Sequence, residues 1–154
     1  MQDGLLPIAQ ILILLCPLLA VALGLIGIVV PVRLKIVQPS PGRTVWAALP
    51  ALLCLALFYS LAAHMHQSLG AWPTSIGERG FPPALAAHAS AANAYFMALI
   101  LLNLSVWPVA YLLCALIRRW RASLYYLGVH MLACLLCLGL MLLAPGPFLY
   151  WWWD

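Results

Sequence analysis

The stretch FPPALAAHASAANAYFMALILLNLSVWPVAYLLCALIRRWR, residues 81–121, decides the fold of this protein. No charged side chain occurs in residues 81–117, and three arginines then follow within four residues. A membrane-spanning helix needs about 20 apolar residues, whereas a helix over residues 83–117 would be about 50 Å long at about 1.5 Å per residue. The stretch therefore predicts a transmembrane helix that begins at Pro82-Pro83 and extends beyond the hydrocarbon on one side.

Three further charge-free runs, residues 4–32, 44–63 and 122–153, are each long enough to cross a membrane. The chain is 67% hydrophobic and 6% charged, whereas a soluble domain carries about 25% charged residues. Helices satisfy their own backbone hydrogen bonds in lipid, and the strict alternation of a membrane barrel is absent. We expect an all-α membrane protein with four transmembrane helices in one domain over residues 1–154. The expected spans are 5–32, 44–64, 83–117 and 122–144, followed by an interfacial tail at 145–154 that turns at Pro145-Gly-Pro147.

The distribution of charge predicts the direction of the four spans. Six of the seven basic residues fall in the first and third gaps: Arg33, Lys35, Arg43, Arg118, Arg119 and Arg121. Basic loops stay in the cytoplasm, which predicts an N-out/C-out topology with the third helix extended on the outer side. Arg79 and the acids, Asp3, Glu78 and Asp154, then lie outside. The short connections suggest a bacterial inner membrane with both termini periplasmic, and basic residues confined to short gaps argue against nucleic-acid binding.

A few polar or small residues inside the spans indicate where helices pack. Asn103 lies near the middle of the third span, and Trp107 shares its helix face by the spacing of four. Because an amide in hydrocarbon needs a partner, we expect this face to contact another helix, with a quinone or lipid headgroup contact as the alternative. Ala20 and Gly24 in the first span predict a second close approach. Pro108 removes a backbone hydrogen bond and predicts a packing kink, with a hinge or a freed carbonyl that lines a site as the alternative.

One face of the fourth span carries potential soft metal ligands. These residues recur at helical spacing: Tyr126, His130, Cys134, Cys137 and Met141. Imidazole, thiolate and thioether suit copper(I) or haem iron, so this stripe is a candidate metal site. A reactive C-x-x-C pair needs access and a nearby positive charge, however, and Cys134-Leu-Leu-Cys137 lies deep in an apolar helix. We therefore expect a packing face rather than a redox motif.

Three histidines lie near the outer ends of the second and third spans. Residues two apart on a helix point in nearly opposite directions, so His64 and His66 cannot both face one site, and His64 with His88 is the expected pair. Two axial imidazoles could hold a haem b. Copper or a divalent ion is an alternative. The plainest interpretation is a set of interfacial histidines that bind water.

The residues missing from the spans restrict the function. No Asp, Glu, Lys or Arg lies inside any span, which argues against proton-coupled transport, and three carboxylates offer little for general acid–base catalysis. The leading hypothesis is a non-catalytic accessory or scaffold subunit of a larger membrane complex, such as a respiratory or photosynthetic one, with integral membrane subunits and the lipid bilayer as partners. The alternatives are a haem b- or copper-binding redox subunit and an oligomeric permease or channel component. A channel would have to build its polar pathway from Asn103, Ser105 and Tyr111.

Overall fold

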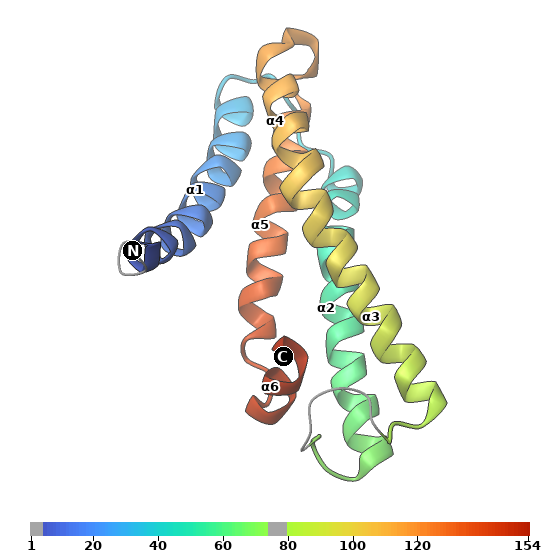
Figure 1. The fold of residues 1–154 in the computed structure, drawn as a ribbon. Coiled ribbons are helices and arrows are strands. Elements are labelled where there is room, and N and C mark those ends of the chain that lie inside the picture. Colours follow the sequence, from blue (N-terminus) through green and yellow to red (C-terminus); the bar gives the residue numbers. More distant parts are fainter. Residues whose placement is uncertain (1–4, 74–79) are drawn as a thin grey trace.

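The computed structural model describes residues 5–73 and 80–154, and the regular structure within them is entirely helical (Figure 1). The helices are α1 (Leu5–Arg33), α2 (Pro41–Leu69), α3 (Pro83–Leu101), α4 (Trp107–Leu116), α5 (Ser123–Met141) and α6 (Gly146–Trp153). A π-helical turn, Leu102–Val106, joins α3 to α4, and a 3-10 turn, Arg118–Trp120, precedes α5. Among the described residues, four segments are long and apolar enough to cross a membrane: Cys16–Arg33 of α1, α2, α5 and the joined helix Pro83–Leu116. The prediction of an all-α protein with four membrane spans is therefore confirmed.

The second helix is longer at both ends than the expected span of 44–64. Pro41 begins it, because a first-turn proline loses no hydrogen bond and has the right φ for a helix. At the other end Gly70 adopts a left-handed conformation (φ 67°), and its N–H donates to the carbonyl of His66 (3.0 Å). The polar segment around His66 therefore stays helical and extends α2 past the hydrophobic span.

Helix α5 is the centre of the bundle. It packs against α1, α2 and α4, and α2 also packs against α3. The C-terminal end of α1 lies beside α5, whereas the N-terminal end of α1 leans away from the other helices (Figure 1). The bundle is consequently open along one side.

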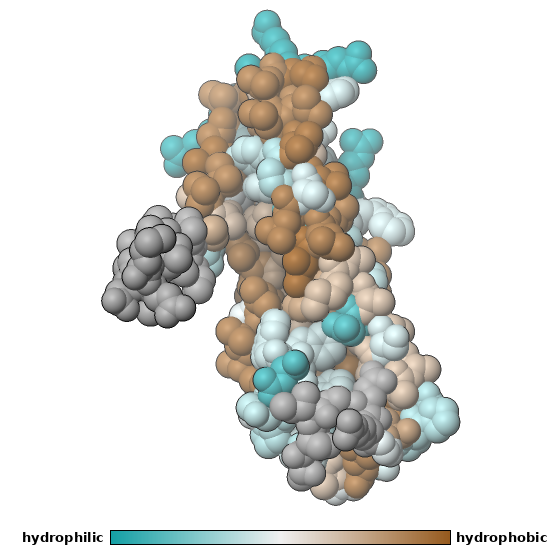
Figure 2. All heavy atoms as spheres, viewed as in Figure 1, coloured by the Kyte–Doolittle hydropathy of each residue, from teal (hydrophilic) through white to brown (hydrophobic). Residues whose placement is uncertain are grey.

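The two connections that carry basic residues, 34–40 and 117–122, lie at the same end of the bundle (Figure 1). We call this the basic end. Figure 2 shows hydrophilic side chains protruding there above a largely hydrophobic surface, as a protein surrounded by lipid requires. Arg79, Asp3 and Glu78 lie outside the described residues, and the assignment of the basic end to the cytoplasm stays a prediction.

Glycines bring α1 and α5 into backbone contact. A Cβ atom added to Gly128 would lie 2.6 Å from the carbonyl oxygen of Gly24, and one added to Gly27 would lie 2.9 Å from the carbonyl oxygen of Leu124. Small residues at such contacts let transmembrane helices approach closely. Gly24 was expected at a close helix contact from its spacing, whereas Gly27 and Gly128 were not. Ala20, its expected partner, instead lines a groove between helices.

The third span contains a π-helical turn just before Pro108. Proline has no N–H and its ring clashes with the carbonyl four residues earlier. The helix widens there, so that the backbone N–H of Trp107 donates to the carbonyl of Leu102, five residues back. The side chains of Asn103 and Ser105 also bond to carbonyls four residues back, a pattern that bends helices. The irregularity expected at Pro108 is thus a π turn that contains Asn103.

The C-terminal residues form a helix that packs into the end of the bundle opposite the basic end. Phe148 is fully buried against Phe58, with ring centroids 5.0 Å apart, and Trp152 contacts both Phe58 and Phe96. Phe148 and Trp152 are four residues apart and share one face of α6. This segment was expected to lie along the membrane interface. The structure buries one face of it because these large aromatic side chains complete the core between α2, α3 and α5.

Replacing Gly128 by alanine should separate α1 from α5, because a backbone oxygen 2.6 Å from the new Cβ atom cannot move aside. We expect the free energy of unfolding to fall by about 1–3 kcal/mol, measured by titrating detergent micelles with dodecyl sulfate while following helix content. Gly139→Ala is the matched control, since nothing lies within 4 Å of its Cβ position on the same helix. Equal losses in the two variants would contradict a close α1–α5 contact.

Candidate functional site

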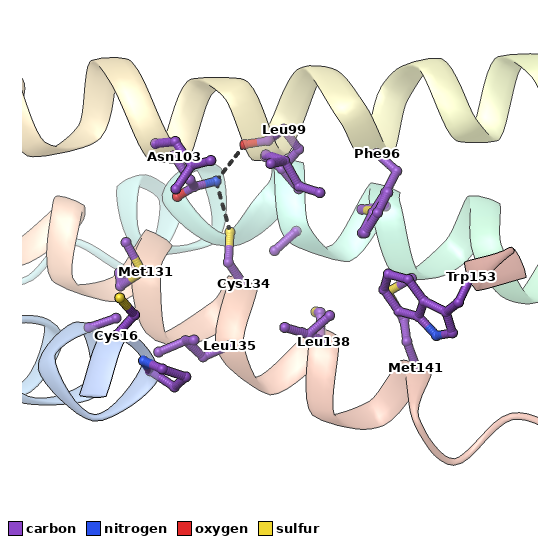
Figure 3. Close-up of a pocket in the computed structure, with 17 residues that line it drawn as sticks. Cys16, Phe96, Leu99, Asn103, Met131, Cys134, Leu135, Leu138, Met141 and Trp153 are labelled. Carbon is purple, nitrogen blue, oxygen red and sulfur yellow. Dashed lines mark hydrogen bonds between the residues drawn. The ribbon is translucent and has the colours of Figure 1, made fainter. Parts of the chain in front are cut away.

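A groove of about 440 Å³ runs along the open side of the bundle (Figure 3). Helices α1, α3 and α5 form its walls, α2 forms its floor, and Trp153 of α6 closes one end. Its lining is apolar except at Asn103 and four cysteines: Cys16, Cys54, Cys134 and Cys137. A concave apolar surface with few polar groups is the usual form of a binding site.

Asn103 is the polar centre of this groove, and its orientation is fixed. Its Nδ2 donates to the carbonyl oxygen of Leu99 (2.8 Å) on its own helix and to the Sγ of Cys134 (3.7 Å) on α5. A carbonyl oxygen only accepts hydrogen bonds, so the amide nitrogen, not the oxygen, must face Leu99. The amide oxygen is consequently directed elsewhere.

A line of hydrogen bonds continues from Asn103 across the bundle. The thiol of Cys134 lies 3.7 Å from Nε2 of His130, and Nδ1 of His130 lies 3.1 Å from the carbonyl oxygen of Ala47 on α2. Because that carbonyl must accept, Nδ1 of His130 carries the proton and Nε2 accepts from the thiol. Asn103, Cys134 and His130 therefore connect the third span, α5 and α2 through one directed chain.

The Oδ1 atom of Asn103 is the exception to this pairing. Among the described side chains it is the one buried oxygen or nitrogen without a hydrogen-bond partner. Other polar side chains in the spans donate hydrogen bonds to backbone carbonyls: Tyr59 to Leu140, Tyr95 to Pro50, Trp107 to Leu127 and Tyr111 to Leu23. A carbonyl cannot satisfy Oδ1, because both atoms are acceptors. An unpaired buried acceptor costs about 1–3 kcal/mol.

The structure divides the stripe of soft ligands predicted on the fourth span between two sites. Cys134, Cys137 and Met141 line the Asn103 groove, whereas Tyr126 and His130 line a second groove nearer the basic end. Within residues 5–73 and 80–154, no three His, Cys, Asp or Glu side chains gather in a way that could hold a metal ion. Cys134 and His130 are engaged with each other and with their neighbours rather than directed at an empty centre.

His64 and His88 are brought together, as their positions predict. Their Nδ1 atoms lie 3.0 Å apart, and Nε2 of His88 lies 3.2 Å from Oγ of Ser60. Ser60 donates its only proton to the carbonyl of Leu57, so its oxygen accepts from Nε2–H of His88. Nδ1 of His88 is then an acceptor, and His64 donates to it from Nδ1.

This pairing leaves no space between the two rings. An iron with two axial histidines sits between their nitrogens, and a direct hydrogen bond occupies that line here. A haem at this position would require α2 and α3 to move apart. His66 is turned to another side, where it stacks on Trp72 with ring centroids 4.7 Å apart.

The three residues proposed for a channel pathway each make a local contact in the single chain. Ser105 is exposed and bonds to the carbonyl of Leu101. The hydroxyl of Tyr111 is bonded to Leu23, and Asn103 lines the groove. Each therefore serves a local contact within or between helices.

The chain was compared with protein-family models, curated proteins and solved structures, and none of them matches it.

The hydrogen bonds at the histidine pair predict two different tautomers. When both rings are neutral, His64 should carry its proton on Nδ1 and His88 on Nε2. A long-range ¹H–¹⁵N correlation spectrum of the protein in micelles, at a pH where both rings are uncharged, reports the tautomer of each ring. The Ser60→Ala variant removes the oxygen that accepts from Nε2–H of His88. It should change the ring signals of His88 and leave those of His64 unchanged. Two Nε2–H tautomers in the wild type would exclude the direct bond between the rings.

Proposed function

We propose that this protein is a non-catalytic subunit of a larger integral membrane complex and that the Asn103 groove receives a transmembrane helix of a partner. The observation that carries this proposal is the unpaired Oδ1 of Asn103 beside an apolar groove on the open side of the bundle. The groove has the walls that a helix can pack on, and the amide lacks one hydrogen bond that none of the described side chains supplies.

The chemistry of the missing partner favours a protein over lipid tails. Acyl chains carry no hydrogen-bond donor, so lipid in the groove would leave Oδ1 unpaired. A serine, threonine, asparagine or glutamine on a neighbouring helix supplies a donor, and such contacts are worth about 0.6–2 kcal/mol in membranes. Because Oδ1 is itself buried, docking requires the Asn103 side chain to turn toward the groove.

The divergence of α1 supports the same proposal. Helix α1 packs mainly on α5 through its glycines, and the wall that it contributes to the groove consists of Cys16, Pro17 and Ala20. Large apolar side chains on its outer faces, among them Leu18 and Leu19, are exposed to the bilayer. A partner helix between α1 and α3 would bury groove surface that this chain alone leaves open.

The proposed setting is a bacterial inner membrane with the basic end facing the cytoplasm. Six basic residues at that end support this orientation, which puts both termini on the outer side. Within this setting we propose a structural role in a complex of the energy-transducing kind.

Photo-crosslinking from the rim of the groove tests whether a partner packs there. Leu104 lines the groove and is 73% exposed, so a photoreactive residue at position 104 should give a protein adduct in native membranes. Leu136 is the matched control: it is 65% exposed, two residues after Cys134 and therefore at the depth of Asn103, but it is not part of the groove lining. A lipid-sized adduct from position 104, or equal adducts from both positions, would overturn the proposal.

The Asn103→Leu variant separates the docking role from a role in stability. Leucine fills the same space without an unpaired acceptor, so the isolated chain should keep its free energy of unfolding to within about 1 kcal/mol. Association with the partner should weaken about three- to tenfold, as expected for one lost interhelical hydrogen bond. The readout is the yield of the crosslink from position 104 and of the complex on native gels. An unchanged yield of both would show that Asn103 does not contribute to docking.

A further inference from the structure

A second groove, of about 420 Å³, lies nearer the basic end between α2, α5 and the π turn with α4. Trp46, Ala47 and Pro50 form the α2 wall. Val106 and Leu102 are exposed on the opposite wall, and Trp46 is 72% exposed, so the groove faces the bilayer. This site is separate from the Asn103 groove and plays no part in the proposed docking of a helix.

Helical spacing places a positive charge next to the α2 wall of this groove. Arg43 precedes Trp46, Ala47 and Pro50 by three, four and seven residues on one continuous helix. These spacings put Arg43 on the same helix face as the α2 wall, one turn closer to the end of the bundle. Its side chain is exposed. Ser123 and Tyr126 of α5 also line this groove.

The described charged residues at the basic end are all positive. The turn that precedes Ser123 carries Arg118, Arg119 and Arg121, all of them exposed. The carboxylates of the chain are Asp3, Glu78 and Asp154. Asp154 lies toward the opposite end (Figure 1), and the other two are outside the described residues. Among the described residues, therefore, no acid neutralises the basic end.

We propose that this groove binds an anionic phospholipid. One acyl chain lies along the apolar walls, and the phosphate sits at the mouth against Arg43 and the arginines of the turn before α5. Basic pockets between transmembrane helices on the cytoplasmic side bind lipids of this kind, and an arginine–phosphate hydrogen bond is charge-assisted. Trp46 lies beside Arg43, and tryptophan rings favour the depth of the headgroups.

The test measures retention of phosphatidylglycerol by the whole chain in micelles of a zwitterionic detergent, by native mass spectrometry. Protein purified in detergent is titrated with phosphatidylglycerol or phosphatidylcholine, at about 0.3 M salt to screen diffuse attraction. The wild type should retain phosphatidylglycerol in preference to phosphatidylcholine. Arg43→Gln should weaken this retention about tenfold, the effect of losing one charge-assisted hydrogen bond.

The matched control is Arg33→Gln, which removes one positive charge from the same end, at the last residue of α1, a helix that contributes no residue to this groove. It should change retention by less than about twofold. Val106→Trp, which fills the groove from an exposed position, should also lower retention. Equal losses in Arg43→Gln and Arg33→Gln, no effect of Val106→Trp, or displacement of the lipid by inorganic phosphate alone would each overturn the proposal.

Discussion

Hydrocarbon offers no hydrogen-bond partner, and this constraint organises the protein at every level. It makes helices the structure of all four spans, and it requires each polar side chain inside them to find a partner within the bundle. The chain mostly meets that requirement with spare lone pairs of backbone carbonyls. Tyr59, Tyr95, Trp107 and Tyr111 each donate to a carbonyl of a neighbouring helix. These bonds tie together helices whose apolar surfaces gain little by leaving lipid.

The same constraint separates donors from acceptors. Every helical carbonyl has a second lone pair, so a donor finds a partner almost anywhere in the bundle, whereas an acceptor needs a side chain with a free proton. His130 and His88 meet this need through the thiol of Cys134 and the ring N–H of His64. The Oδ1 atom of Asn103 does not. This asymmetry singles out Asn103 among the described polar side chains of the spans, and for that reason the proposed function rests on its amide.

The two grooves described above differ in the chemistry of their linings. The Asn103 groove is apolar with a single unpaired acceptor and lies between α1 and the third span. The groove near the basic end has mostly apolar walls, and we place Arg43 and the arginines of the turn before α5 at its mouth. An uncharged acceptor suits the side chain of a partner helix, and a cluster of positive charge suits a phosphate. The glycine contact between α1 and α5 sets the first groove, because it holds α1 against α5 while the rest of α1 diverges.

The sequence by itself determined the four spans, the position of the long third helix, the irregularity at Pro108 and the closeness of His64 to His88. These features follow from hydrophobic length, charge and helical spacing, which are local properties of the chain. The tertiary structure alone decided that Gly27 and Gly128 meet, that Phe148 turns inward, and that Cys134 joins Asn103 to His130. It also decided that His64 and His88 bond to each other directly. Such features depend on the distance and rotation between helices, which the sequence of one helix does not specify. The unpaired oxygen of Asn103 belongs to the same class, because only the assembled bundle shows which partners are missing.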